Sequence, residues 1–186
     1  AVVVVSSDKC YENRESPYAY READALGGHD VYSMSKAGTE MVASAWRRSF
    51  FQGDDSQVCI TSARGGNVIG GGDFATDRIV PDCMRALAAG KPIPIRNPHA
   101  VRPWQHVLDC LSGYLTIGAA IIDAPGNSPL ASAFNIGPMA NCQRPVRELV
   151  DEILSCWPGT REDHRREAAA DRCTFLLRGT HTKLCQ

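Results

Sequence analysis

The chain has 186 residues, of which 44% are hydrophobic and 22% charged, and this is the composition of a globular protein with a sizeable core. Its 20 Lys and Arg against 21 Asp and Glu leave a formal net charge of −1, without the basic excess that nucleic-acid-binding proteins usually show. The longest apolar run, at residues 1–5, is far too short to span a bilayer. We therefore expect neither a nucleic-acid partner nor a membrane association.

Eight cysteines are spread along the chain at irregular spacings, and none of them forms a C-x-x-C pair. A zinc site needs clustered ligands, and a disulfide framework is typical of small secreted domains with little core. We therefore expect no metal site, and we expect reduced thiols in a cytoplasmic protein.

Predicted strands alternate with predicted helices from the first residue onward. The β-branched run at residues 1–5 predicts a strand that is buried on both faces, as in a parallel sheet covered by helices. Asp30 is placed to cap a helix over residues 31–50, and the next strand is expected at residues 58–63. Pro81 suits the first turn of a helix that ends before position 90.

The second half of the chain continues this alternation as far as residue 157. The expected elements are a short strand at 93–95, a helix at 106–122, a short strand at 133–136 and a helix from 145 to about 157. The alternation predicts the α/β class. Residues 1–157 are expected to form one partial domain, and the polar stretch 158–186 stays unassigned.

The strongest local motif is the Y-x-x-x-K pattern formed by Tyr32 and Lys36. Residues four apart share a helix face, so the two side chains are expected to lie side by side. An ammonium group favours the phenolate form of a nearby tyrosine, and such a tyrosine can remove a proton from a sugar hydroxyl. By itself the pattern is common, and a surface pair would produce it as well.

Ser7 adds context, because it stands at the end of the first predicted strand, 25 residues before Tyr32. This arrangement resembles the Ser, Tyr and Lys triad of the extended short-chain dehydrogenase/reductase family. The resemblance implies a Rossmann-type parallel sheet, of which this chain would hold the C-terminal part with a small α/β substrate-binding region. It also implies NAD as cofactor, bound in part by Tyr32 and Lys36. Ser7 and Tyr32 would contact the carbinol oxygen, and Lys36 would also hold the nicotinamide ribose.

Asp8 and Lys9 narrow the resemblance to the nucleotide-sugar 4,6-dehydratases. Those enzymes carry an acid at the position of Asp8, which protonates the departing C6 hydroxyl. At the position of Lys9 they usually carry a glutamate that removes the C5 proton, so the resemblance implies that Lys9 is the base. The sequence around Lys9 resembles the CDP-glucose branch of the family, in which a lysine replaces this glutamate. The resemblance implies a CDP-hexose substrate and a role in deoxysugar biosynthesis, as for lipopolysaccharide O-antigen. The segments that fit this branch are 7–13, 28–36, 64–73 and 96–107.

Four further residues are candidates for binding the sugar nucleotide. The resemblance implies that Asn67 and Arg102 contact the diphosphate, and a guanidinium suits that role because it pairs with phosphate oxygens in a bidentate manner. Arg96 could help to hold the nucleotide, and Asn135 is the fourth candidate.

The glycine-rich motif G-x-x-G-x-x-G, which grips the NAD pyrophosphate in this family, does not occur in the chain. The run at positions 70–72 follows a late strand, so we interpret it as a substrate-side loop or a tight turn. We expect about 110 residues of such a protein to precede Ala1. The 186 residues alone are then expected to bind NAD poorly and to turn over little, whereas the complete protein would form a homodimer.

Two other interpretations stay open. A nucleotide-sugar 4-epimerase would keep the tyrosine and lysine, but it needs no acid and base beside the serine, so Asp8 and Lys9 favour elimination. A nucleotide-sugar-binding fragment without catalytic activity would explain the missing glycine motif, whereas the intact set of active-site residues favours an enzyme.

Overall fold

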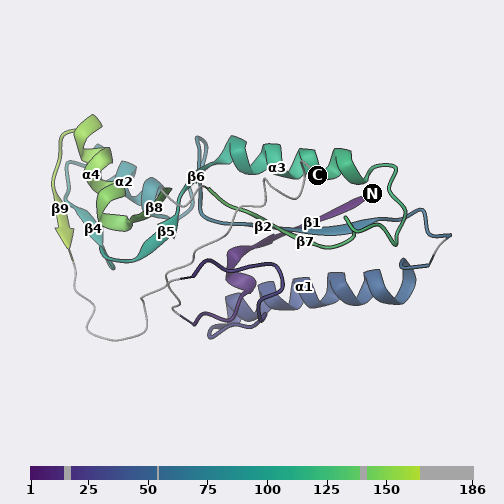
Figure 1. Ribbon diagram of the computed structural model, residues 1–186. Helices are drawn as coiled ribbons and strands as arrows, with labels where there is room; N and C mark the ends of the chain where they lie inside the picture. Colours follow the sequence, from purple (N-terminus) through teal and green to yellow (C-terminus); the bar gives the residue numbers. More distant parts are fainter. Residues whose placement is uncertain (15–17, 54, 139–141, 164–186) are drawn as a thin grey trace.

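A computed structural model describes residues 1–14, 18–53, 55–138 and 142–163 (Figure 1). Its centre is a parallel sheet in the order β1-β2-β7. The three strands are β1 (Val2–Ser7), β2 (Ile60–Gly65) and β7 (Ala133–Ile136). The α/β class and the parallel sheet are therefore confirmed.

Two helices cover the sheet, one on each face, as Figure 1 shows. They are α1 (Val31–Phe50) and α3 (Val107–Ile121). Side chains alternate along β2, so that Ala63 packs with Ile117 of α3 while the next residue, Arg64, contacts α1. All six residues of β2 are buried, as expected for the central strand.

The first strand departs from its prediction. β1 was expected to be buried on both faces, but Val2 is 42% exposed and Val5 is 56% exposed. The prediction is wrong because β1 is an edge strand of the sheet in the described residues, and α1 leaves an apolar groove along it. Only Val3 joins the core beneath α3.

The start of α1 follows the sequence prediction closely. The Asp30 carboxylate accepts a hydrogen bond from the Ser33 backbone N–H (2.9 Å) and another from the Ser33 hydroxyl (2.7 Å). This is N-capping, which supplies partners to the first turn of a helix. Gly28 lies so close to this turn that a Cβ on it would meet the Met34 nitrogen at 2.4 Å.

A smaller α/β part lies beside the sheet and is drawn at the left of Figure 1. Its own core is built from Cys83, Leu87, Ile93, Ile95 and Val150. The elements of this part are α2 (Ile79–Ala88), β4 (Ile93–Ile95), β5 (Val101–Pro103), β8 (Gln143–Pro145), α4 (Val146–Cys156) and β9 (Arg161–Asp163). A short parallel pair, β3 (Val68–Ile69) with β6 (Gln105–His106), links it to the sheet.

The helices and short strands predicted in the second half of the chain are confirmed, with bounds that differ by at most a few residues. Strand β9 pairs in parallel with β4, so at least residues 161–163 of the unassigned stretch belong to the smaller part. Residues 164–186 lie outside the described residues, and the domain boundary at 157 stays a prediction.

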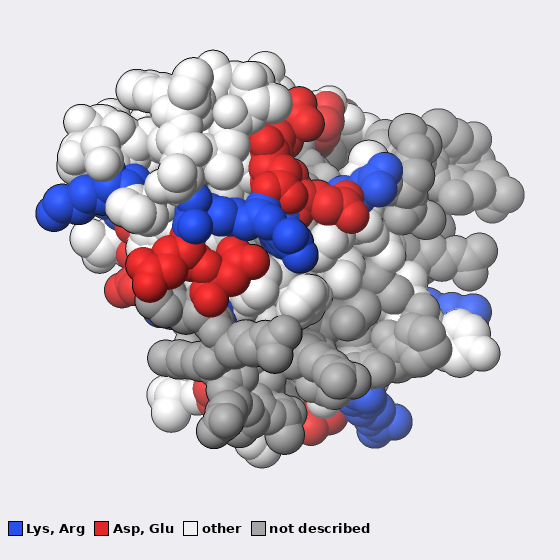
Figure 2. Space-filling view, turned by 90° about the vertical axis from the view of Figure 1, so that its left-hand side faces the viewer, with Lys and Arg blue, Asp and Glu red and all other residues white. Residues whose placement is uncertain are grey.

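Opposite charges alternate on the face of the smaller part that Figure 2 shows, where Lys and Arg side chains lie between those of Asp and Glu. Arg161 pairs with Asp151 and Asp163, and Arg144 pairs with Glu148 at 3.3 Å. Among the described residues, no helix combines the length and the apolar character that a membrane span needs.

Candidate active site

A short 3-10 turn, η1 (Asp8–Cys10), follows β1 directly and carries the predicted acid and base. The Ser7 hydroxyl oxygen accepts a hydrogen bond from the Lys9 backbone N–H (3.1 Å) and donates one to the Asp8 carboxylate (3.0 Å). Ser7 therefore caps the turn and also holds one oxygen of Asp8. The carboxyl ends of parallel strands are where α/β proteins place their ligands, so the position fits a catalytic site.

The Asp8 side chain is 4% exposed, and within the described residues its second carboxylate oxygen, Oδ2, has no hydrogen-bond partner. Burial raises the pKa of Asp8 above its ordinary value, although the charges of Lys9 and Arg102 and the hydrogen bond from Ser7 act in the opposite direction. A carboxyl group with a raised pKa keeps its proton to higher pH, which suits a general acid.

The turn η1 packs against α1, the helix that carries the tyrosine and the lysine. The Lys36 Nζ atom lies 5.5 Å from the centre of the Tyr32 ring, as the four-residue spacing predicts. Tyr32 is 53% exposed, so its phenol is open to a ligand. Hydrogen bonds from Ser33 lower the pKa of Asp30, and the charge of Lys9 adds to this effect, which places Lys9 near the start of the same helix.

Two of the predicted substrate residues are half-buried, and one of them, Arg102, lies near Asp8. Arg102, in β5, is half-buried and close enough to Asp8 to affect its pKa. Asn67 is half-buried just beyond β2, and its carbonyl accepts a hydrogen bond from the Gln105 N–H (3.0 Å), which joins β3 to β6.

The other two predicted substrate residues already have partners within the chain. Arg96, 58% exposed after β4, forms an ion pair with Asp77 at 3.1 Å. Asn135 is 1% exposed; its Oδ1 accepts from the Tyr11 hydroxyl (2.6 Å), and its Nδ2 donates to the Tyr20 carbonyl (3.0 Å). Substrate binding by these two residues stays a prediction, and for Asn135 it would require rearrangement of a buried amide.

The sequence prediction missed a buried polar network next to η1. Arg64 donates to the Glu40 carboxylate (2.8 Å) and to the Tyr11 hydroxyl (2.7 Å), and the Ser62 hydroxyl donates to Glu40 (2.7 Å). One signal could have revealed it: an arginine in a strand that must be buried needs a charged partner. The sequence could not show that Glu40, one turn beyond Lys36, is that partner.

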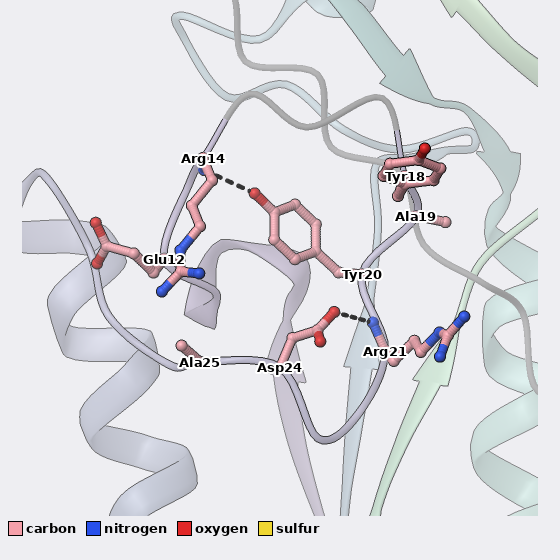
Figure 3. Close-up of a pocket in the computed structure, with 8 residues that line it drawn as sticks. All are labelled: Glu12, Arg14, Tyr18, Ala19, Tyr20, Arg21, Asp24 and Ala25. Atoms are coloured by element: carbon pink, nitrogen blue, oxygen red, sulfur yellow. Dashed lines mark hydrogen bonds between the residues drawn. The ribbon is translucent and has the colours of Figure 1, made fainter.

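A cavity of about 450 Å³ lies in the loop between η1 and α1 (Figure 3). In that view Tyr20 accepts a hydrogen bond from the Arg14 N–H (2.8 Å), and Asp24 accepts one from the Arg21 N–H (2.7 Å). Within the described residues, none of the predicted catalytic or substrate side chains lines this cavity. The cavity is therefore distinct from the candidate active site.

Comparison with known proteins identifies the family. The NAD dependent epimerase/dehydratase family matches residues 1–137, which is most of the chain. The chain belongs to this family. It is also 43% identical over 160 residues to a CDP-glucose 4,6-dehydratase of Salmonella typhimurium, covering 84% of this chain and 44% of that protein.

One further relative and two solved structures extend the comparison. The chain is 32% identical over 95 residues to a trifunctional UDP-glucose 4,6-dehydratase of Arabidopsis thaliana, covering 50% of this chain and 13% of that protein. The dTDP-glucose 4,6-dehydratase of Bacillus anthracis, solved in complex with NAD, has a TM-score of 0.76 at 22% identity, over 98% of this chain and 53% of that one. A UDP-N-acetylglucosamine 4-epimerase of Methanobrevibacter ruminantium also has a TM-score of 0.76, at 15% identity, over 98% of this chain and 55% of that one.

These structural similarities establish the fold and leave the reaction open, because dehydratases and epimerases of the family share it. The chain spans 44% of the length of the Salmonella relative and about half the length of these solved structures. We therefore give the activity of the whole protein as a proposal.

Proposed function

We propose that the protein at its natural length is an NAD-dependent 4,6-dehydratase that converts CDP-glucose into CDP-4-keto-6-deoxyglucose and water. The observation that carries the proposal is the buried Asp8, with its raised pKa, beside Lys9 at the carboxyl end of β1 and next to the helix of Tyr32 and Lys36. The identity to the Salmonella protein supports the choice of the CDP-sugar.

The side chains present fit the nicotinamide end of NAD. Tyr32 is exposed, and Lys36 lies beside it, so a phenol and an ammonium group are both available to a ribose and a sugar hydroxyl. Because no G-x-x-G-x-x-G motif occurs in the 186 residues, the fit is limited to this end of the cofactor. Bound NAD would accept a hydride from sugar C4 and later return it to C6.

The protein side chains would manage the protons of the reaction. Tyr32 takes the proton of the C4 hydroxyl while the C4–H bond breaks, and Lys36 stabilises the charge on the phenol oxygen. The resulting C4 ketone acidifies the C5 proton, which the Lys9 side chain removes. Asp8 donates its proton to the C6 oxygen, which leaves as water, and C5 regains a proton when C6 receives the hydride.

Substrate binding is assigned in part to the guanidinium of Arg102. Its position near Asp8 would place one phosphate of the nucleotide close to the reacting sugar, and Asn67 would contact the same diphosphate. Arg96 and Asn135 remain weaker candidates because of their existing contacts. Ser7 would contact the carbinol oxygen while it keeps Asp8 in place.

The proposed assembly is a cytoplasmic homodimer that pairs through α1. Cys10, Cys59, Cys83, Cys110 and Cys156 are free thiols in the structure, which supports a reducing compartment. Helix α1 carries several large apolar side chains that are about half exposed or more, as expected of a helix that packs against a partner. These side chains are Val31, Met34, Met41, Val42, Trp46 and Phe50.

The test is an assay of the natural-length protein with CDP-glucose, UDP-glucose and dTDP-glucose, followed by detection of the 4-ketosugar. We expect the ketosugar from CDP-glucose alone or at the highest rate. Formation of a ketosugar from dTDP-glucose only would disprove the CDP assignment. Conversion of a nucleotide-sugar into its C4 epimer, without loss of water, would replace the dehydratase by an epimerase.

A further inference from the structure

Tyr11 lies two residues after Lys9, the proposed base, and its side chain is fully buried. Its hydroxyl accepts a hydrogen bond from Arg64 (2.7 Å) and donates one to Asn135 (2.6 Å). Its ring stacks on Tyr20 with the ring centres 5.0 Å apart. Contacts with other segments therefore hold both the hydroxyl and the ring of Tyr11.

The partners of this hydroxyl are themselves fixed by other elements. Arg64 in β2 is held by Glu40 of α1, and Asn135 in β7 donates to the Tyr20 carbonyl. The Tyr11 hydroxyl therefore joins the end of η1 to two strands of the sheet and, through Arg64, to the helix of Tyr32 and Lys36.

The turn η1 is short, and its internal backbone hydrogen bonding is weak. It has three residues, and the backbone bond that closes it, from the Tyr11 N–H to the Asp8 carbonyl, is long at 3.4 Å. Short 3-10 turns have poor hydrogen-bond geometry, so their side chains depend on neighbouring contacts for position. Outside the turn, η1 packs against α1, and the Cys10 carbonyl accepts a hydrogen bond from the Gly27 N–H (3.0 Å). Tyr11, the C-cap residue of the turn, adds the contacts with the sheet.

We propose that Tyr11 is a positioning residue for the elimination step: its hydroxyl, held between Arg64 and Asn135, fixes η1 so that Asp8 and Lys9 keep their places relative to α1. This inference rests on the proposed dehydratase function. The oxidation at C4 depends on Tyr32 and Lys36, which lie on α1. The ion pair of Glu40 with Arg64 joins α1 to β2 whether or not the Tyr11 hydroxyl is present.

The variant Tyr11→Phe removes the hydroxyl and keeps the ring and its stack on Tyr20. Misplacing reacting groups by about 1 Å can cost roughly 100-fold in rate. We expect kcat on CDP-glucose to fall about 10- to 100-fold, with KM changed by less than about threefold. The control is Tyr114→Phe, which removes a tyrosine hydroxyl near Cys110 of α3, on the opposite face of β2.

The decisive measurement uses the natural-length protein and CDP-glucose that carries deuterium at C4 or at C5. If elimination has become the slow step, Tyr11→Phe will show a larger isotope effect from the C5 label and a smaller one from the C4 label than the wild type. Tyr114→Phe should retain the wild-type values. A loss of turnover with both isotope effects unchanged would overturn the inference, because it would indicate general damage.

A second readout needs neither cofactor nor substrate. Cys10 lies within η1, and burial raises the pKa of its thiol to about 12, so it should react slowly with a maleimide in the native protein. We expect Tyr11→Phe to accelerate labelling of Cys10, measured by peptide mass spectrometry, whereas Tyr114→Phe should not. Equal labelling in all three proteins would overturn the inference.

The two readouts separate this inference from the proposed function. If no nucleotide-glucose yields a ketosugar with the wild type, the dehydratase proposal fails, while the labelling experiment still tests whether Tyr11 holds η1. Should Tyr11→Phe be partly unfolded, the labelling of all three proteins is repeated at a lower temperature, at which circular dichroism shows the variant to be folded. The folded variant should show the same accelerated labelling of Cys10; slow labelling would count against the inference.

Discussion

Replacing Glu40 by alanine should destabilise the protein by about 3–5 kcal/mol, because it leaves a buried guanidinium without its partner. Glu40 is 3% exposed and Arg64 is 4% exposed, and their charged groups lie 2.8 Å apart. The pair joins α1 to β2, so its loss acts on the two elements that carry and support the candidate site.

The magnitude follows from the geometry. At 2.8 Å the attraction is about 6 kcal/mol for an effective dielectric constant of about 20, and the cost of burying two charges offsets much of it. Arg64 keeps hydrogen bonds to Tyr11 and to the Glu22 carbonyl, so we expect the lower part of the range. The isosteric change Glu40→Gln keeps an acceptor and should cost about 1–3 kcal/mol.

The assay is urea unfolding followed by tryptophan fluorescence, with the exposed pair of Arg144 and Glu148 as the control. Glu148→Ala should change stability by less than about 1 kcal/mol, because both side chains are more than half exposed. The double variant Glu40→Leu with Arg64→Met should recover most of the loss. A cost of less than about 1 kcal/mol for Glu40→Ala would refute the reasoning.

Three further predictions concern the residues around η1 and α1. The pKa of Asp8 in the folded protein is raised above its ordinary value of 3.8. Protonation of Asp8 therefore contributes to the stability of the fold below about pH 4, and this contribution is lost as the pH rises through the folded-state pKa. Asp8→Asn should therefore stabilise the protein more at about pH 7 than at about pH 4 in thermal unfolding, and an effect independent of pH would contradict the assignment. Tyr32→Phe should lower turnover of CDP-glucose by roughly 10²- to 10⁴-fold while the melting temperature stays near that of the wild type; unchanged turnover would exclude Tyr32 as the base. Gly28→Ala should destabilise by about 1–3 kcal/mol, since its Cβ would meet the Met34 nitrogen at 2.4 Å, and wild-type stability in urea would show that the loop yields easily.

The sequence by itself determined the α-helices, the strands of the central sheet and the list of candidate catalytic residues. The Asp30 cap fixed the start of α1, and the four-residue spacing placed Lys36 beside Tyr32, because both depend only on helix geometry. The family resemblance, carried by short motifs near Ser7 and Tyr32, agrees with the family match over residues 1–137.

The tertiary structure decided which residues support the site. The contacts of Asn135 with Tyr11 and of Arg64 with Glu40 join positions far apart in the chain, and no local pattern specifies such pairs. The exposure of Val2 and Val5 also depends on which strand lies at the edge of the sheet, since a β-branched run looks the same at an edge and at the centre. Local spacing is encoded residue by residue, whereas burial and polar pairing depend on the packing of the whole chain.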